Sequence, residues 1–368
     1  MIQKSFNYMV VKGIKSSKKP IMGWVCTYTP LELIYAAGFQ PYRIIGHSNP
    51  VKSADSYIHP NYCQFVKSTI DVAIENGYNF LEGVVFVNSC DAMRRLHDVW
   101  KANIPTKFIY ILDIPMGYSS LGLEYISTEF EKFKTMLEKY TSNVIREETL
   151  ENSIDIFIES RSLFHSLNSL RLKNPPQITG SEIMEITSEF FKSDPNIWNE
   201  RIKEKLTRSG KKATTSDIIE KPRLILSGSP IHDVNFISFI EDCGFNVVYE
   251  DLCTGSKFFD IQINKSKDLL SALGEAYLNR VPCARMMKIE DRAKNIINIS
   301  KNYYANGIIH HSLKFCDTYL YDVPRLKELL VEKDLNVLFL ESDGSLGSLN
   351  QLKTRIEAFL EIIKSQMR

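Results

Sequence analysis

The sequence predicts an α/β protein made of two doubly wound parallel-sheet lobes that are joined by a helical segment. Short, continuous apolar runs alternate with amphipathic helical stretches in two separate series, and such runs are typical of parallel strands buried on both faces. Between the two series the chain keeps helical periodicity without a strand-like run. The length of 368 residues also suits two domains of ordinary size.

The first series contains four strand-like runs, each followed by a helical stretch. The helix over 30–38 has proline at its start and glycine past its end, the usual asymmetry of helix termini. Such alternation predicts successive βαβ units. In chain order the predicted elements are a strand at 21–26, a helix at 30–38, a strand at 40–46, a helix at 63–77, a strand at 81–89, a helix at 91–103, a strand at 106–115 and a long helix from about 121 to 140.

The second series repeats the pattern after the strand-free stretch, which runs from about 151 to 212. Its predicted elements are a strand, turn and helix at 221–244, a strand at 245–252, helices from about 266 to 306, a strand at 307–313, a helix at 317–333, a strand at 335–342 and a helix at 349–366. We therefore predict a flavodoxin-like or Rossmann-like N-terminal α/β lobe at 1–150, a helical bridge at 151–215 and a similar C-terminal lobe at 216–368. In such sheets ligands bind outside the carboxyl ends of the strands.

Composition narrows the class of function. Hydrophobic residues make up 44% of the chain, charged residues 24%, and the net charge is +1. A chain with this balance has no bulk attraction to nucleic acid or to anionic membranes. The first twenty residues lack the apolar core of a secretion signal, and no run is long enough to span a membrane. We expect a cytoplasmic protein without nucleic acid or membrane partners.

Two nucleotide-binding motifs are missing. The glycine- and lysine-containing stretch at 207–217 lacks the first glycine of a P-loop and follows no strand, so ATP hydrolysis is not expected. No predicted strand leads into G-x-G-x-x-G, which leaves a nicotinamide or flavin site unsupported. No residue can be assigned as catalytic acid or base from these patterns.

Three of the seven cysteines occupy positions that suit a metal centre. Cys90 and Cys316 each follow a buried strand and precede an aspartate, and Cys63 opens a helix, where amide N–H groups favour a thiolate. The odd number of cysteines and the expected compartment argue against disulfides. Because the chain has no C-x2-C pair, an iron–sulfur cluster suits these thiols better than zinc. The competing chemistry is a nucleophilic cysteine beside His310 or His311.

Six segments, in order and spacing, resemble the subunits of 2-hydroxyacyl-CoA dehydratases, a superfamily that also includes benzoyl-CoA reductase subunits and double-cubane-cluster reductases. The resemblance extends from about Ile21 to Ile363. The segments are GWVCTYTPLELIYAAGFQPYRIIG, NYCQFVKS, LEGVVFVNSCDAMRRL, SGSPIHD, KFCDTYLYDVP and LESDGSLGSLNQLKTRIEAFLE.

The resemblance implies that Cys63, Cys90 and Cys316 hold a 4Fe–4S cluster between the lobes, with Asp91 and Asp317 capping the helices that follow. Cys26 is expected to be an additional ligand, a cleft-lining thiol or a structural residue. The other three cysteines, Cys243, Cys253 and Cys283, are predicted to be structural or to lie in the core or a loop. His310 and His311 are expected to alternate between the two faces of their strand.

The implied activity is dehydration of a (R)-2-hydroxyacyl-CoA by a radical mechanism, after a separate ATP-dependent iron–sulfur activator delivers one electron. A homologous second subunit, or a second copy of the chain, would complete a dimer. Two alternatives stay open. One is a homodimeric reductase with a double-cubane 8Fe–9S cluster, or a benzoyl-CoA-type reductase, and the other is a non-catalytic subunit that transfers electrons. The acyl group of the substrate cannot be derived from the sequence.

Overall fold

The computed structural model describes residues 18–209, 221–231, 233–344, 347 and 349–367. Three sequence predictions fall outside these ranges. They concern the first seventeen residues, most of the glycine- and lysine-containing stretch, and the boundary between the predicted bridge and C-terminal lobe. His232, within the fourth resembling segment, also lies outside the described residues.

The first parallel sheet has the strand order β2-β1-β3-β4. Its strands are β1 (Ile21–Trp24), β2 (Gln40–Arg43), β3 (Leu81–Val87) and β4 (Phe108–Leu112). All residues of β1 and β2 are buried, as expected for strands covered on both faces. The order reverses between β1 and β3, so the carboxyl ends of these two strands flank a crevice.

The second sheet repeats this topology with the order β6-β5-β7-β8, again entirely parallel. Its strands are β5 (Arg223–Gly228), β6 (Asn246–Asp251), β7 (Gly307–Leu313) and β8 (Val337–Ser342). Gly228 ends β5 with a φ of +125°, and a Cβ there would overlap the carbonyl oxygen of His311 on β7. Glycine is therefore needed where these two central strands end.

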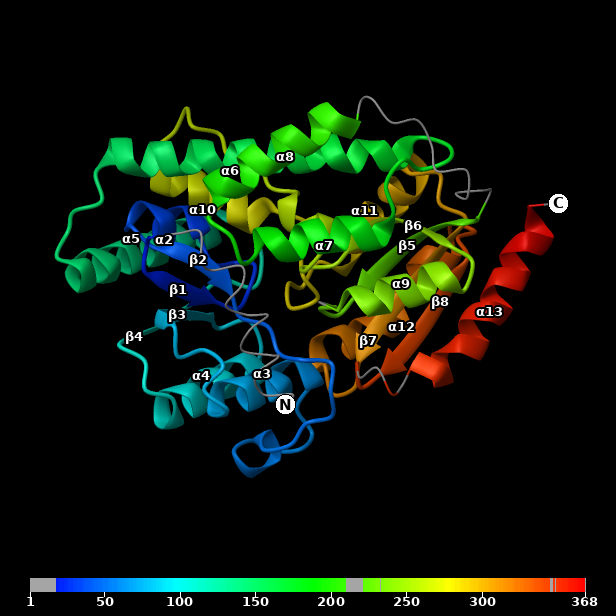
Figure 1. Cartoon of the computed structure of the whole chain (residues 1–368), viewed down its shortest axis with the longest axis horizontal. Helices are drawn as coiled ribbons and strands as arrows, with labels where there is room; N and C mark the ends of the chain where they lie inside the picture. Colours follow the sequence, from blue (N-terminus) through cyan, green and yellow to red (C-terminus); the bar gives the residue numbers. More distant parts are fainter. Residues whose placement is uncertain (1–17, 210–220, 232, 345–346, 348, 368) are drawn as a thin grey trace.

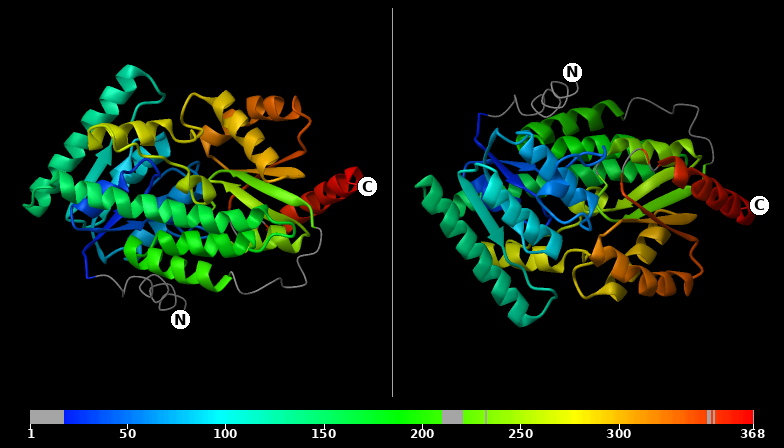
Figure 2. Two further views of the ribbon diagram at one scale, coloured as in Figure 1. Left: turned by 90° about the horizontal axis from the view of Figure 1, so that it is seen from above. Right: turned by 90° about the horizontal axis from the view of Figure 1, so that it is seen from below.

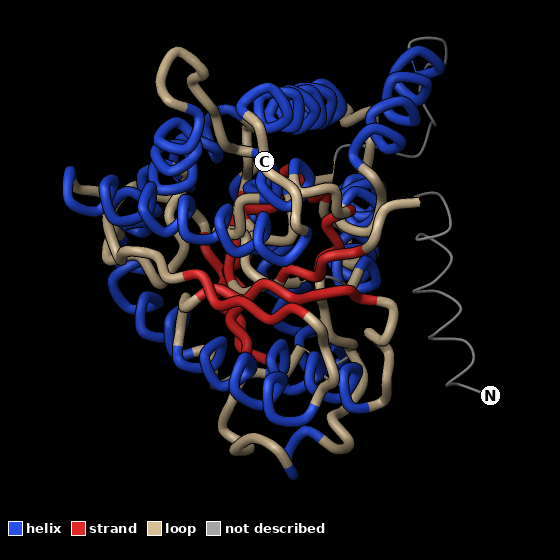
Figure 3. The backbone as a smooth tube through the Cα atoms, turned by 90° about the vertical axis from the view of Figure 1, so that its left-hand side faces the viewer, coloured by secondary structure: helices blue, strands red, loops and turns tan. Residues whose placement is uncertain are grey.

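Helices surround both sheets (Figure 1), and Figure 3 shows strands at the centre of the molecule with helices on either side. Those of the first series are α2 (Leu31–Ala36), α3 (Gln64–Ile74), α4 (Asp91–Asn103) and α5 (Ser120–Thr141). In the sequence, the helices that come between the strands of the first sheet and those of the second are α6 (Glu147–Asn168), α7 (Gly180–Phe190) and α8 (Pro195–Ser209). The second series has α9 (Val234–Asp242), α10 (Leu269–Asn279), α11 (Ile289–Asn302), α12 (Asp317–Val331) and α13 (Leu349–Gln366). Short 3-10 turns lie at Ala54–Ser56, Ser169–Leu172 and Ser256–Phe259.

One helix of the second series packs on the first lobe. Apolar residues of α10 share a core cluster with β1 and α5, and Figure 2 shows α10 beside α5. Glu32 of α2, which is fully buried, accepts hydrogen bonds from Arg161 of α6 and Tyr277 of α10. The lobes are thus tied together by the chain segment that runs between β6 and β7.

The predicted fold class is confirmed: two parallel four-stranded sheets with flanking helices form an α/β protein of two lobes. The predicted domain limits stay a prediction, because the boundary at 215 falls outside the described residues. Within the described ranges no helix combines the length and apolar character needed to cross a membrane.

Candidate functional site

Six of the seven cysteines line a single cavity between the two lobes. This cavity, which we call the thiol cavity, is open, and its space, including the part continuous with solvent, amounts to about 660 Å³. Its cysteines are Cys26, Cys63, Cys90, Cys253, Cys283 and Cys316. Cys63, Cys90 and Cys316, which lie far apart in the sequence, are therefore brought together as the sequence suggests.

Four of these six cysteines lie shortly after the carboxyl end of a strand. Cys26 follows β1 and Cys90 follows β3, on either side of the point where the strand order of the first sheet reverses. Cys253 follows β6 and Cys316 follows β7 in the second sheet. The carboxyl edges of both sheets thus face one cavity, as expected for ligand sites of open parallel sheets.

The turn before Cys316 has an unusual backbone. Phe315 has a φ of +61°, a left-handed conformation that side chains other than glycine and asparagine adopt rarely. This residue turns the chain between β7 and α12, so that Cys316 becomes the residue before the helix. Leu313, just upstream, also lines the cavity. The strained turn is consistent with a functional demand on the position of the Cys316 thiol.

The predicted caps of the two Cys-Asp motifs are wrong. Cys90 and Cys316 are themselves the N-cap residues, and neither helix has a side-chain cap hydrogen bond. Asp91 and Asp317 are the first helical residues instead, where a carboxylate still interacts favourably with the helix dipole. Asp91 accepts a hydrogen bond from the hydroxyl of Tyr62 at 2.8 Å.

Burial raises the pKa of the Cys63, Cys90 and Cys316 thiols and so favours their protonated form. It raises the pKa of Cys90 to about 12, with the neighbouring thiols of Cys316 and Cys26 adding to the effect. The pKa of Cys63 is also raised, first by burial and then by proximity to Cys316. The expected stabilisation of a Cys63 thiolate by its helix terminus is therefore outweighed by desolvation. A metal cation bound by these sulfurs would offset that desolvation and hold them as thiolates.

Two buried arginines place positive charge in the wall of the cavity. The Arg43 guanidinium donates to the carbonyl oxygen of Cys253 at 2.6 Å and lies 3.5 Å from its Sγ. Its Nε has no hydrogen-bond partner in the described part of the chain. Arg285 donates to the carbonyl oxygens of Asn88, Ile114 and Pro115. Both side chains line the cavity, which favours an anionic occupant.

Tyr319 supplies a hydroxyl group to the same wall. The side chain is 3% exposed and lines the cavity, yet among the described residues its oxygen has no hydrogen-bond partner. Burial raises its pKa well above the usual value, which keeps the hydroxyl protonated. An unsatisfied buried donor of this kind is unfavourable unless an acceptor occupies the cavity.

These residues fit an iron–sulfur cluster better than a single metal ion. Among the described residues, no three His, Cys, Asp or Glu side chains are close enough to hold one ion. In a cluster each thiolate binds a different iron atom, so its ligands are set farther apart. No described carboxylate or imidazole lines the thiol cavity, which leaves thiolates as the ligands and matches the preference of such clusters.

Two cysteines that the sequence analysis treated as structural also line the cavity. Cys253 lies two residues after the end of β6, so its position after a buried strand, which it shares with Cys90 and Cys316, could have indicated it. Cys283 lies between α10 and α11, where no strand end signals its position. Cys243, at the end of α9, lies outside the cavity as predicted.

The two histidines of β7 alternate between faces as predicted. His310 contacts the Ser227 hydroxyl at 3.2 Å, and His311 contacts the Ser342 hydroxyl at 2.8 Å. Neither lines the thiol cavity. The arrangement therefore gives no support to a Cys-His nucleophile.

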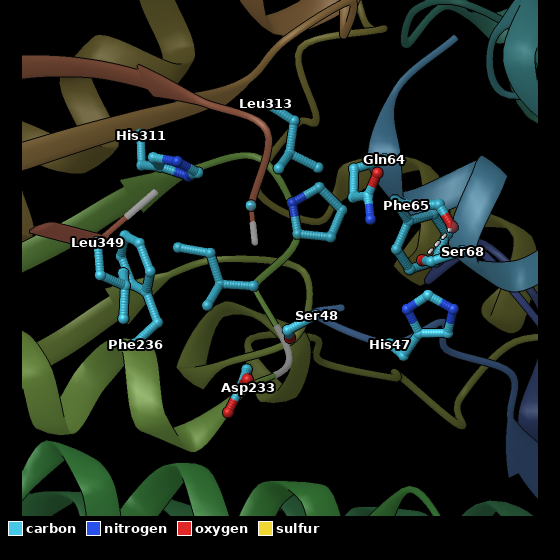
Figure 4. A pocket seen from close by; sticks show the side chains of 13 residues that line it. His47, Ser48, Gln64, Phe65, Ser68, Asp233, Phe236, His311, Leu313 and Leu349 are labelled. Carbon is cyan, nitrogen blue, oxygen red and sulfur yellow. Dashed lines mark hydrogen bonds between the residues drawn. The ribbon is translucent and has the colours of Figure 1, made fainter. Parts of the chain in front are cut away.

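A second pocket, of about 450 Å³, adjoins the thiol cavity and shares Phe65, Pro230 and Leu313 with it. Figure 4 shows side chains of the two lobes on opposite sides of this pocket, with His47 and Gln64 facing Phe236 and His311. The cleft between the lobes therefore continues beyond the cysteines.

Known proteins are similar to this chain over nearly its whole length. The profile of the family described as 2-hydroxyglutaryl-CoA dehydratase, D-component, matches residues 26–363. The (R)-phenyllactyl-CoA dehydratase beta subunit of Clostridium sporogenes is 24% identical, over 96% of this chain and 94% of the relative. A benzoyl-CoA reductase subunit of Thauera aromatica is 23% identical, over 94% of this chain and 91% of the relative.

The lactoyl-CoA dehydratase subunit beta of Anaerotignum propionicum is 24% identical, over 94% of this chain and 92% of the relative. The similarity to these three proteins extends across both lobes, and the family match spans the cysteines from Cys26 to Cys316. By the extent of that match, this chain belongs to the family of 2-hydroxyglutaryl-CoA dehydratase D-components.

Proposed function

We propose that this chain is the iron–sulfur subunit of a 2-hydroxyacyl-CoA dehydratase, a hydro-lyase that removes water from a (R)-2-hydroxyacyl-CoA. The observation that carries the proposal is the thiol cavity, where six cysteines from both lobes converge. Relatives from two organisms bear the names of dehydratase subunits that act on phenyllactyl-CoA and lactoyl-CoA.

Cys63, Cys90 and Cys316 would hold a 4Fe–4S cluster, with Cys26 as a candidate for a further ligand. Such a cluster, when bound, supplies one-electron chemistry and an iron atom open to an oxygen ligand. The residues around it have separate tasks. Arg43 and Arg285 would offset negative charge, and the Tyr319 hydroxyl, which has no partner among the described residues, would donate a hydrogen bond to a group bound in the cavity.

The proposed reaction needs partners. Two of the dehydratase relatives are named as beta subunits, which supports assembly with a homologous subunit, although a dimer of identical chains satisfies the same requirement. As the resemblance to the dehydratases implies, a separate ATP-dependent iron–sulfur activator would deliver the electron for the radical mechanism, and this chain has no P-loop of its own. Light scattering under anaerobic conditions tests the assembly: an active, cluster-containing monomer would contradict it.

Metal analysis of anaerobically purified protein tests the cluster. We expect about four iron and four sulfide per chain. Replacing Cys63, Cys90 or Cys316 with serine removes a soft ligand, so each variant is expected to lose most of its iron. Cys243→Ser, outside the cavity, is the matched control and keeps its iron. Wild-type iron content in Cys90→Ser and Cys316→Ser would refute the proposal, provided that circular dichroism is unchanged.

The number of thiols supports a second candidate, a homodimeric reductase with a double-cubane 8Fe–9S cluster. Two cubanes joined by one sulfide leave about six irons for thiolates, and six cysteines line the cavity. This candidate predicts about eight iron per chain. It also predicts that Cys253→Ser and Cys283→Ser lose iron, whereas a single cubane held by three cysteines predicts that both variants retain it.

A further inference from the structure

A third pocket lies beside the thiol cavity, and many of the side chains that line it are polar or charged. It is open, has a volume of about 330 Å³, and is formed by the loop before α5, the end of α10 and one side of α11. A volume of this size suits a small-molecule ligand. Its polar and basic residues are Tyr118, Asn279, Arg280, Lys288, Asp291, Lys294, Asn295 and Asn298.

Residues 282–288, which we call the wall segment, lie between this pocket and the thiol cavity. Cys283 and Arg285 line the thiol cavity, whereas Pro282, Met286 and Lys288 line the pocket. Hydrogen bonds hold this wall against the first lobe: the backbone N–H of Cys283 donates to Tyr28, and that of Met287 donates to Met116. A ligand in the pocket is therefore separated from the thiol cavity only by the wall segment.

The chemistry of the pocket favours an anion with several phosphate groups. Lys288 and Lys294 contribute two positive charges against the single carboxylate of Asp291. The Arg280 guanidinium is close by but donates to the backbone carbonyl oxygens of Thr27, Lys257 and Phe258. The Lys288 ammonium lies 3.8 Å from that carboxylate, and the Lys288 side chain keeps a third of its surface exposed. Positively charged pockets of this kind concentrate anionic ligands.

Amide donors add to this charge. The Nδ2 of Asn295 is buried and makes no hydrogen bond with any described residue. A buried amide without an acceptor is unfavourable unless a ligand supplies one. At the rim, the half-exposed ring of Tyr118 has the Lys288 ammonium 5.5 Å from its centre and offers a flat apolar face. Phosphate oxygens and a purine ring are complementary to these two features.

We propose that this pocket binds the nucleotide end of the CoA thioester, with the phosphates on Lys288, Lys294 and Asn295 and the adenine near Tyr118. The inference rests on the proposed function, which supplies the CoA thioester as substrate. It adds a binding site, formed by α11 and the wall segment, that is separate from the cysteines.

Calorimetric titration of the anaerobically purified protein with CoA tests the site. The double variant Lys288→Ala/Lys294→Ala is expected to bind CoA at least about tenfold more weakly, because it loses two charged hydrogen-bond donors. Lys301→Ala is the matched control, since Lys301 is exposed on the same helix but does not line the pocket. In the wild type, CoA should also protect Lys288 and Lys294 from acetylation, as measured by mass spectrometry.

Equal affinity of the double variant and the wild type would overturn the proposal, as would the absence of protection at both lysines. Pantetheine is expected to bind equally to both proteins because it lacks the nucleotide. If ADP bound as tightly as CoA, the pocket would belong to a free nucleotide and the CoA assignment would fail. Iron content, measured on the same samples, tests the proposed function separately: intact iron with no CoA binding refutes only this pocket.

Discussion

At the scale of single residues, the cysteines are unusual because their surroundings oppose ionisation. A thiolate is the reactive and metal-binding form of cysteine, yet burial raises the pKa values of Cys63, Cys90 and Cys316. Burial in the fold therefore favours the neutral thiol form of these three cysteines. A positively charged metal would reverse the balance by replacing the protons.

Alkylation of cluster-free protein measures this effect. With a pKa of about 12, Cys90 should react with iodoacetamide at pH 8 roughly a thousandfold more slowly than an unperturbed thiol. Its rate should rise about tenfold per pH unit up to that pKa. Cys243, which is only partly buried, should react faster and serves as the internal control. Equal rates at both cysteines, followed by peptide mass spectrometry, would contradict the burial argument.

His311 links stability to acid pH. Burial lowers its pKa from 6.5 to about 4, so the folded state binds the proton less readily than the unfolded state. The corresponding stability, roughly 3 kcal/mol, is fully present above pH 6.5 and is lost as the pH falls toward 4. His311→Gln should flatten the decrease in urea-unfolding free energy over this range. The control is His59→Gln, because His59 is exposed. If the unfolding free energy changed with pH equally in the wild type and in both variants, the prediction would be wrong.

At the scale of elements, the second sheet depends on one glycine. Gly228→Ala would place a Cβ against the His311 carbonyl oxygen at a left-handed φ, so we expect a loss of roughly 4 kcal/mol or more. Gly38→Ala is the matched control, because Gly38 also has a positive φ but no atom lies within 4 Å of its Cβ position. Its cost should be about 1–2 kcal/mol. Similar losses in chemical denaturation would show that the close approach of β5 and β7 is unimportant.

Sequence patterns predict a helix or strand well where the local order of apolar and polar residues is enough to identify it. Apolar runs identified strands such as β3 and β7 because both faces of each are buried. A position shortly after such a strand indicated Cys90 and Cys316 and could have indicated Cys253. It could not locate Cys283, whose position depends on the packing of α10 and on the hydrogen bond from its backbone N–H to Tyr28.

Sequence patterns do not determine which elements pack against each other in the tertiary structure. The amphipathic sequence of α10 indicates a buried face but does not say which lobe covers it, and the structure places that face against α5. Arg43 likewise ends an ordinary strand in the sequence, and only the folded structure shows its guanidinium against Cys253. These long-range contacts distinguish the complete cavity from the set of three cysteines that the sequence suggests.

At the scale of the whole molecule, the crossing of α10 ties the two lobes into one cooperative unit. Leu273 and Tyr277 of this helix are buried in the core of the first lobe. Arg280, just beyond the helix, donates to the carbonyl oxygen of Thr27 in the first lobe and to those of Lys257 and Phe258. The loss of either lobe would therefore expose apolar surface of the other.

The three tryptophans allow this coupling to be measured, because all of them lie outside the second sheet and its helices. They are Trp24, Trp100 and Trp198, each fully buried. If the lobes unfold together, Gly228→Ala in the second lobe should lower the midpoint of tryptophan fluorescence in thermal unfolding as much as that of circular dichroism. Independent lobes would leave the fluorescence midpoint at the wild-type value. We expect coincident shifts, since the cavity between the lobes keeps its shape only when α10 and the wall segment stay docked on the first lobe.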